Sequence, residues 1–155
     1  MKIYFKTPIG NLFIEESANK ITAIGLSPNI IMTGVSRLLL TAKKQLQEYF
    51  VGKRKVFDIP VAFRGTAYQI AVWKQLLLLP YGGTASYSEV AFSMGNKKAA
   101  RSVGAACRCN PLMIIVPCHR VIGKNKKLTG YAGGLDIKEK LLILEKKYAA
   151  ADGNI

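Results

Sequence analysis

The spacing of apolar residues changes once along the chain, and this change constrains the fold more than any other feature. In the runs 2–7, 11–17 and 21–26, apolar side chains alternate with polar ones or are rich in aromatic residues. Such runs are typical of strands, and the turn residues around Gly10 predict that the first two form a hairpin. From about residue 36 onward, apolar residues recur at helical spacing. The chain is therefore predicted to be α+β.

Four helices are expected in the middle of the chain, each with a recognisable end. Ser86 and Glu89 form a capping box that opens a helix of about two turns, and Gly95 then turns the chain. Two short helices joined by such a turn indicate a helix-turn-helix motif. The predicted ranges are 36–50 closed by Gly52, 66–79 closed by Pro80, 86–94, and 97–109 stopped by Pro111.

The remaining segments divide the chain into two predicted domains, 1–62 and 63–155. Residues 56–63 read as a short strand or an extended linker, and 112–116 as a buried strand or core segment. A basic, glycine-rich loop at 123–134 leads to a last helix, for which Asp136 and Glu139 supply a capping box. Residues 149–155 are expected to fray. The first domain contains no histidine or cysteine, so its role is expected to be structural.

A possible nucleophile lies at Cys118, beside His119, the only histidine in the chain. A thiol reacts as thiolate, and an adjacent imidazole with a local excess of positive charge is the usual means of lowering its pKa. The alternative is a buried cysteine that acts only as a small apolar residue. A thiol hydrolase is a further alternative, although it would also need an oxyanion hole.

Disulfide and metal interpretations of the cysteines are weaker. Cys107, Cys109 and Cys118 lie within twelve positions, too close together to join two halves of a fold. With His119 they could nominally supply four metal ligands, but no Cys-x-x-Cys pair is present. We therefore expect no metal.

The positive charge is concentrated, which favours a polyanionic partner. Lys and Arg outnumber Asp and Glu by 23 to 9, and no acidic residue lies between Glu89 and Asp136. The predicted helix 97–109 combines small residues, which permit close approach, with basic residues that could neutralise phosphates. A helix packed tightly on another helix is the alternative. The charge favours nucleic acid.

The N-terminus lacks the apolar run and cleavage site of a signal peptide, and the apolar run 76–79 is too short to span a bilayer. We expect no membrane association and a cytoplasmic, reducing location.

Several short motifs follow one another between Gly65 and about Glu145. They are Tyr68-Gln69-x-x-Val72-Trp73, Pro80-Tyr81-Gly82-x-Thr84, Ser86-Tyr87, Ala99-Ala100-Arg101-x-Val103-Gly104, Asn110-Pro111, Pro117-Cys118-His119-Arg120-Val121, Gly130-Tyr131-x-Gly133-Gly134-Leu135 and Lys138-Glu139-x-Leu141-Leu142-x-x-Glu145. In their order and spacing this part of the chain closely resembles the O6-alkylguanine-DNA alkyltransferases, and the N-terminal half is similar to the variable domain of that family by pattern.

The resemblance implies a small ribonuclease H-like α/β domain followed by a mostly helical domain with a helix-turn-helix of winged-helix type. It implies direct repair of double-stranded DNA, bound through the minor groove by a monomer. An alkyl group passes irreversibly from O6-alkylguanine, and from O4-alkylthymine, to the protein itself, without a cofactor. A non-catalytic lesion sensor of the same fold is the alternative.

The resemblance also assigns roles to particular residues. Cys118 is the acceptor, His119 is the base acting through a water, and Glu145 orients His119. Asn110 couples the recognition helix to the active-site segment, and Tyr87 assists proton delivery to the leaving base. Arg101 is inserted into the duplex. The other DNA-binding positions are Lys97, Lys98, Ala100, Ser102 and Arg108. The pocket for the base is formed by Tyr131, Val121, Ala132, Gly133 and Lys138.

Some positions depart from the family pattern. Tyr68 stands where phenylalanine is common, and some relatives bind zinc in an N-terminal domain that here lacks cysteine and histidine. Cys107 and Cys109 are not part of the motif, and their nearness to the site predicts sensitivity to oxidation.

Overall fold

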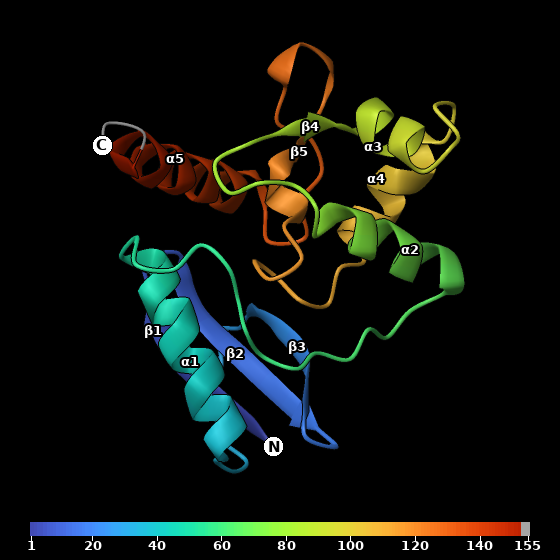
Figure 1. The fold of residues 1–155 in the computed structure, drawn as a ribbon. Helices are drawn as coiled ribbons and strands as arrows, with labels where there is room; N and C mark the ends of the chain where they lie inside the picture. Colours follow the sequence, from blue (N-terminus) through green and yellow to red (C-terminus); the bar gives the residue numbers. More distant parts are fainter. Residues whose placement is uncertain (153–155) are drawn as a thin grey trace. The chain divides into compact units, whose positions relative to one another are not determined.

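The computed structural model describes residues 1–152, and the chain divides into two compact units. The first comprises residues 1–64 together with 111–113, and the second comprises residues 65–110 and the chain from Ile114 onward. Figure 1 shows a sheet with one helix in the first unit and mostly helices in the second. The predicted α+β class is confirmed.

The first unit contains the three predicted strands, which form an antiparallel sheet in the order β1-β2-β3. They are β1 (Lys2–Thr7), β2 (Gly10–Ser17) and β3 (Lys20–Leu26). Alternate residues of β2 are buried, which is the pattern that the sequence predicted. Asn19 has a φ of 61°, a conformation that asparagine tolerates well, and it helps to form the tight turn between β2 and β3.

One helix, α1 (Arg37–Phe50), packs on this sheet through an apolar face that includes Leu39, Leu46 and Tyr49. Ser36 caps it by accepting a hydrogen bond from the backbone N–H of Leu39. The predicted helix is thus confirmed. Residues 56–63 do not form a strand, and among them only Val61 forms an isolated bridge, with Ile21.

The helices of the second unit are shorter than predicted at some ends. They are α2 (Ala67–Leu76), α3 (Tyr87–Ser93) and α4 (Ala100–Arg108). The capping box of Ser86 and Glu89 is confirmed at the start of α3. α4 begins three residues later than predicted, because Asn96 accepts hydrogen bonds from the N–H groups of Lys98 and Ala99 and holds them in a turn.

A buried hydrogen bond joins α2 to α4. Nε1 of Trp73 donates to the carbonyl oxygen of Ala106 at 2.9 Å, and Trp73 is 1% exposed. Because a buried indole N–H needs an acceptor, this bond fixes where the two helices meet. Through this bond α4, which carries most of the small and basic residues, is fixed to the core of the second unit.

The segment between α4 and the cysteine is a core segment rather than a strand. Residues 112–116 are all buried, but they form single-residue bridges instead of a strand, among them one between Leu112 and Ile24. Ile114 has a φ of 73°, a left-handed conformation that no strand adopts and that is unusual for a β-branched residue. Of the two predicted alternatives, the core segment is confirmed.

The last part of the chain contains a two-stranded parallel sheet of β4 (Ala85–Ser86) and β5 (Val121–Ile122), the turn η2 (Lys124–Lys126), and α5 (Leu135–Asp152). The predicted capping box before α5 is wrong, because the helix already includes Leu135 and Asp136 lies in its first turn. Fraying is also wrong for 149–152, which are helical; residues 153–155 lie outside the described part.

Within the described residues, no helix is both long enough and apolar enough to cross a membrane.

Candidate active site and DNA interface

Cys118, His119 and Arg120 form a single turn, η1 (Cys118–Arg120), in which all three side chains are buried. Their exposed fractions are 2%, 0% and 7%. The turn follows the buried segment 112–116 and runs directly into β5, which is paired with β4. The candidate nucleophile is therefore held between two ordered elements, as a reactive group that must be positioned accurately should be.

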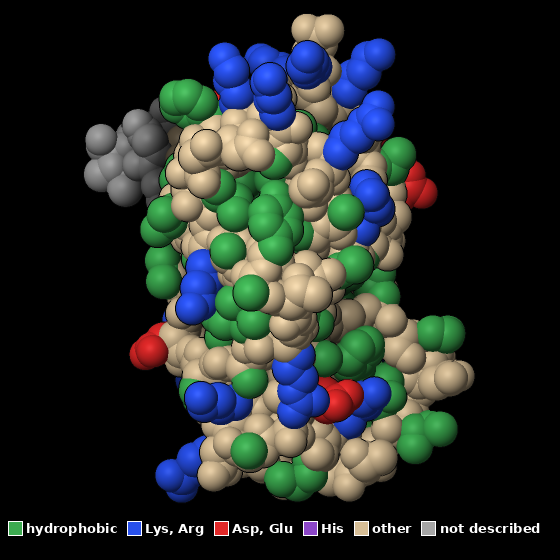
Figure 2. All heavy atoms as spheres, turned by 90° about the vertical axis from the view of Figure 1, so that its right-hand side faces the viewer, with side chains coloured by type: hydrophobic (Ala, Val, Ile, Leu, Met, Phe, Trp, Pro, Cys, Tyr) green, Lys and Arg blue, Asp and Glu red, His purple; other side chains and the backbone are tan. Residues whose placement is uncertain are grey.

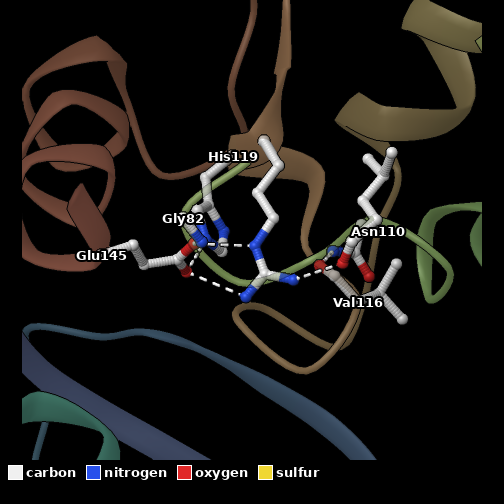
Figure 3. Close-up of polar contacts among 7 residues, drawn as sticks. Gly82, Asn110, Val116, His119 and Glu145 are labelled. Carbon is white, nitrogen blue, oxygen red and sulfur yellow. Dashed lines mark hydrogen bonds and ion pairs between the residues drawn. The ribbon is translucent and has the colours of Figure 1, made fainter. Parts of the chain in front are cut away.

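Several polar groups around this turn bond to one carboxylate on α5. Glu145 is fully buried, and its Oε2 lies 2.5 Å from Nε2 of His119. Arg120 donates from Nε to Oε1 at 2.7 Å and from Nη2 to Oε2 at 3.1 Å, and the N–H of Gly82 donates to Oε1 at 3.1 Å. Figure 3 shows these groups converging on Glu145. We call them the Glu145 cluster.

The cluster determines the charges of its members. Burial alone would raise the pKa of Glu145, but hydrogen bonds and charge from His119 and Arg120 outweigh burial and lower it to about 2. Burial lowers the pKa of His119, against the opposing effect of Glu145. At neutral pH the carboxylate is ionised and the imidazole neutral. Nε2 therefore carries the hydrogen, and Nδ1, which has no partner among the described residues, keeps its lone pair.

We expect the free energy of unfolding to fall as the pH is lowered from neutral. Both groups bind protons more weakly when folded, so their contribution is complete above the unfolded pKa values, 6.5 for His119 and 4.5 for Glu145, and is lost below them. The shift of Glu145 alone corresponds to about 3 kcal/mol. Urea unfolding at about pH 7 and pH 3 measures the part of this loss that occurs above the folded pKa, about 2 kcal/mol for Glu145. An equally steep pH dependence in Glu145→Gln would contradict the assignment to Glu145.

Arg120 was counted in the sequence only among the basic residues near Cys118, and no role in the site was predicted for it. Besides its two bonds to Glu145, its Nη1 donates to the carbonyl oxygen of Leu79 at 2.8 Å, just after α2. Its position next to His119 could have indicated this role. A buried, ionised carboxylate beside a neutral imidazole needs a cation nearby. The hydrogen bond from His119 and the charge of Arg120 therefore both help to keep Glu145 ionised.

The surroundings of Cys118 favour the protonated thiol. Burial raises its pKa well above the usual range, and the neighbouring thiol of Cys107 raises it further. Asn110 opposes this by a hydrogen bond to Cys118, and its Nδ2 also donates to the carbonyl oxygen of Val116 at 2.9 Å. The usual lowering of a thiol pKa beside an imidazole is thus not found here. Nε2 of His119 faces Glu145 instead of the sulfur.

A second polar group lies around Tyr87, at the start of α3. Its hydroxyl donates to the carbonyl oxygen of Thr129 at 2.7 Å and accepts from Nζ of Lys138 at 3.4 Å; Lys138 also donates to Thr129 at 2.8 Å. Burial raises the pKa of Tyr87 and lowers that of Lys138, which is fully buried. The phenol therefore stays protonated and can donate.

A hollow of about 350 Å³ opens beside α4, and we call it the α4 hollow. It is lined by Tyr87, Ala100, Arg101, Gly104, Arg108, Thr129 and Gly130. A side chain at Gly104 would fill part of it, because an added Cβ would come within 3.7 Å of the Tyr87 ring. The α4 hollow is thus lined both by α4, the predicted DNA-binding helix, and by Tyr87 with its hydrogen-bond partner Thr129.

The lining differs from the pocket that the sequence predicted. The residues expected there, Tyr131, Val121, Ala132, Gly133 and Lys138, do not line the α4 hollow. Val121 and Lys138 are buried in the interior. Burial raises the pKa of Tyr131. Sequence reasoning missed Thr129 and Gly130, which act partly through backbone atoms that no side-chain pattern reveals.

The predicted DNA-binding residues lie on or just before α4. Lys97, Lys98, Arg101, Ser102 and Arg108 are exposed, and Ala100 is half-buried. Figure 2 shows Lys and Arg side chains gathered at the upper end of one face, with few acidic atoms and no histidine in view. Small residues let α4 approach a surface closely, and its basic residues can contact phosphates. The predicted basic face is therefore exposed.

No group of three or more histidine, cysteine or acidic side chains in the described part of the chain is placed to hold a metal ion.

Comparison with known proteins matches both halves of the chain. Residues 1–63 match the ribonuclease-like domain of 6-O-methylguanine DNA methyltransferase, and residues 67–147 match the DNA-binding domain of the same family. The ribonuclease-like fold expected for the N-terminal part is thus confirmed.

Individual relatives agree with the domain matches. A constitutive methylated-DNA–protein-cysteine methyltransferase of Bacillus subtilis is 44% identical over 152 residues, covering 91% of this chain and 92% of the relative. One from Methanosarcina acetivorans is 58% identical over 104 residues, 67% of each chain.

Solved structures agree as well. O6-methylguanine methyltransferase of Mycobacterium tuberculosis is 42% identical, with a TM-score of 0.86 and coverage of 96% of this chain and 94% of that one. A structure of the M. tuberculosis protein in complex with DNA has a TM-score of 0.87, is 42% identical, and covers 95% of this chain and 93% of that one. The chain belongs to the 6-O-methylguanine DNA methyltransferase family.

Proposed function

We propose that the protein repairs alkylated DNA by accepting the alkyl group of O6-alkylguanine, and of O4-alkylthymine, on Cys118 in a single irreversible turnover. The observation that carries this proposal is a buried thiol next in sequence to His119, whose neutral imidazole bonds to the ionised carboxylate of Glu145, in the same unit as a helix with exposed basic residues. The thioether that forms has no route back to a thiol, so each molecule acts once. No step in this reaction requires a cofactor.

The proton of Cys118 moves as the alkyl group arrives. His119 takes it on Nδ1 through a water molecule, while Nε2 stays bonded to the carboxylate of Glu145. The sulfur forms a bond to the alkyl carbon, and the electron pair of the breaking carbon–oxygen bond stays on the guanine oxygen. Because the carboxylate stabilises the imidazolium that results, the thiol can remain protonated until substrate is present. This fits the raised pKa of Cys118.

Tyr87 and Lys138 act on the leaving base. Guanine leaves more readily if no full negative charge develops on it, so a proton donor is needed on the side away from the sulfur. The hydroxyl of Tyr87 is protonated and lies beside the α4 hollow, and it accepts a hydrogen bond from Nζ of Lys138. For donation to the base, this hydroxyl exchanges its bond to Thr129 for one to the substrate.

The DNA interface centres on α4, which we propose enters the minor groove. Lys97, Lys98, Ser102 and Arg108 contact the backbone, and Ala100 allows close approach. Arg101 lies at the rim of the α4 hollow and fills the space left by the extruded base. Asn110, bonded to Val116, links the end of α4 to the segment that carries Cys118. Tyr131, Val121, Ala132 and Gly133 shape the pocket around the base.

The protein is proposed to act as a monomer, with residues 1–62 as a structural domain and 63–155 as the domain that binds DNA and reacts. It is also proposed to work in the reducing cytoplasm, since all three cysteines are free.

Intact-mass measurement after incubation with duplex DNA containing O6-methylguanine tests the proposal. The chain should gain one methyl group, mapped to the tryptic peptide 109–120, and Cys118→Ala should gain none. Cys109→Ser is the matched control, because it removes the other thiol of that peptide and should leave the gain unchanged. Retained binding to alkylated DNA without any change in mass would support a lesion sensor instead.

A further inference from the structure

The carboxylate of Glu145 bonds to two different partners, an imidazole and a guanidinium. Its Oε2 lies 2.5 Å from Nε2 of His119 and accepts from Nη2 of Arg120 at 3.1 Å, while Oε1 accepts from Nε of Arg120 at 2.7 Å. The side chains of His119 and Glu145 are 0% exposed, and that of Arg120 is 8% exposed. The reaction proposed above gives tasks to His119 and Glu145, but none to Arg120.

Charge balance decides whether the imidazole of His119 carries an added proton. With Arg120 present, the guanidinium and the carboxylate cancel, so a proton on the imidazole would leave a net positive charge in the interior. Without Arg120, the carboxylate would be unbalanced, and a protonated imidazole would balance it. An unbalanced charge is costly in the interior, which solvates charge far less well than water does. Arg120 therefore opposes the attraction of Glu145 for a proton on His119.

The other titratable groups around the pair do not take over this task. Lys138, a buried cation on α5, also disfavours a proton on His119, but it is present in every variant described below and does not affect their comparison. Tyr81 and Tyr131 also interact with the charge of the carboxylate. Burial raises the pKa of both phenols, so both are uncharged at neutral pH. Arg120 is thus a permanent charge bonded directly to the carboxylate that His119 uses.

We infer that Arg120 is a positioning residue for alkyl transfer, which keeps the imidazole of His119 free of an added proton at neutral pH so that Nδ1 can accept the proton of Cys118. Its role in the reaction rests on the proposed function, whereas the protonation of His119 can be measured without any substrate.

Sharing the carboxylate lets His119 be neutral at rest and still be stabilised when it reacts. An imidazole bonded to an unshared, buried carboxylate would hold a proton at neutral pH and could not take another. Here the ring is neutral before the reaction, and the carboxylate remains bonded to Nε2 when the proton arrives on Nδ1. The direction of the shift agrees, because burial lowers the pKa of His119 and the charge of Arg120 lowers it further, against the effect of Glu145.

Isotope-labelled histidine tests this role without DNA. His119 is the only histidine in the chain, so labelling with nitrogen-15 histidine gives ring-nitrogen NMR signals from that residue alone. These signals distinguish a neutral ring, which has one bare nitrogen, from an imidazolium, in which both nitrogens carry hydrogen. The wild type should show a neutral ring with hydrogen on Nε2 at about pH 7. Arg120→Gln should raise the pH at which the ring takes up a proton by about one unit or more.

Three further variants separate charge from packing. Arg120→Lys keeps a cation beside the carboxylate, so the ring should stay neutral at about pH 7. Combining Glu145→Gln with Arg120→Gln removes both charges and should reverse the proton uptake caused by Arg120→Gln alone. Arg54→Gln is the matched control, because it removes an arginine that bonds to a glutamate, Glu48, in the first unit. It should leave the ring signals unchanged.

The pH dependence of methyl transfer supplies the functional readout. As the pH is lowered, the single-turnover rate on duplex DNA containing O6-methylguanine should fall at a higher pH in Arg120→Gln than in the wild type, because the base is already protonated over more of the range. The shift of this acid limb should equal the shift of the ring signals. Arg120→Lys should keep the wild-type limb, even with a lower maximal rate. A residue that only supports the fold would lower the rate equally at every pH.

An imidazolium in the wild type at about pH 7 would overturn the inference, and so would an unchanged protonation of the ring in folded Arg120→Gln. Proton uptake in Arg120→Lys as strong as in Arg120→Gln would also count against it, since charge would then not be the cause. If Arg120→Gln does not fold, Glu145→Gln is compared with the double variant. The ring should take up its proton at a lower pH in Glu145→Gln, where Arg120 remains, and equal values would contradict the role of Arg120.

Failure of the proposed function would look different. It would appear as no gain of a methyl group on Cys118 in the wild type, whatever the ring signals of His119 show.

Discussion

Replacing Glu145 by alanine should lower the free energy of unfolding by about 3–5 kcal/mol and abolish most of the alkyl transfer. The carboxylate is fully buried and accepts hydrogen bonds from Arg120, His119 and Gly82. Without it, the guanidinium of Arg120 remains in the interior as an unpaired charge. Burial of such a charge costs more than the loss of an ordinary side chain contact.

Urea unfolding followed by circular dichroism measures the first effect, and single-turnover methyl transfer at a temperature where the variant is folded measures the second. Glu139→Ala is the matched control, since Glu139 lies on the same helix and is exposed. It should change stability by less than about 0.5 kcal/mol. Glu145→Gln keeps the shape and one acceptor oxygen, so its loss should be intermediate. Equal stability of Glu145→Ala and Glu139→Ala would refute the central role of Glu145.

Replacing Arg101 by alanine should slow repair of O6-methylguanine in duplex DNA about a hundredfold, while reaction with the free base stays unchanged. Extrusion of a base costs a few kcal/mol, and a side chain that occupies the vacated space offsets part of it. Arg101 is exposed near the start of α4 and lines the α4 hollow, so it can reach the stack while Cys118 stays buried. The free base needs no extrusion and therefore no such side chain.

Single-turnover rates on the two substrates measure the difference. Lys98→Ala serves as the control, because an exposed lysine that contacts phosphate should weaken binding to damaged and undamaged DNA alike and reduce the salt dependence by about one unit. A loss in Arg101→Ala that is equal on duplex and free base would assign Arg101 to the chemistry instead of to extrusion.

Local patterns were sufficient to predict most elements of the fold. The strands of the first sheet followed from alternation, and the start of α3 followed from Ser86 and Glu89, since both signals act within a few residues. The late start of α4 was missed because Asn96 holds the residues before it by its side chain and carbonyl. Here the competing hydrogen bonds were local, but the sequence pattern did not reveal which of them would form.

The candidate site was predictable only where composition left few choices. With a single histidine, the candidate base could only be His119, and its closeness to Glu145 agrees with the partner that the family resemblance implied. The third member, Arg120, could not be predicted from spacing, because its contacts with Leu79 and Glu145 span 41 and 25 positions.

The sharing of one carboxylate by several donors has a consequence for how the site titrates. His119, Arg120 and the N–H of Gly82 all bond to the two oxygens of Glu145, and Arg120 also holds the carbonyl of Leu79. A proton added to Glu145 weakens all of these bonds at once. The imidazole and the carboxylate therefore titrate as a coupled pair, and spectroscopic signals from either residue should report apparent pKa values that belong to the pair.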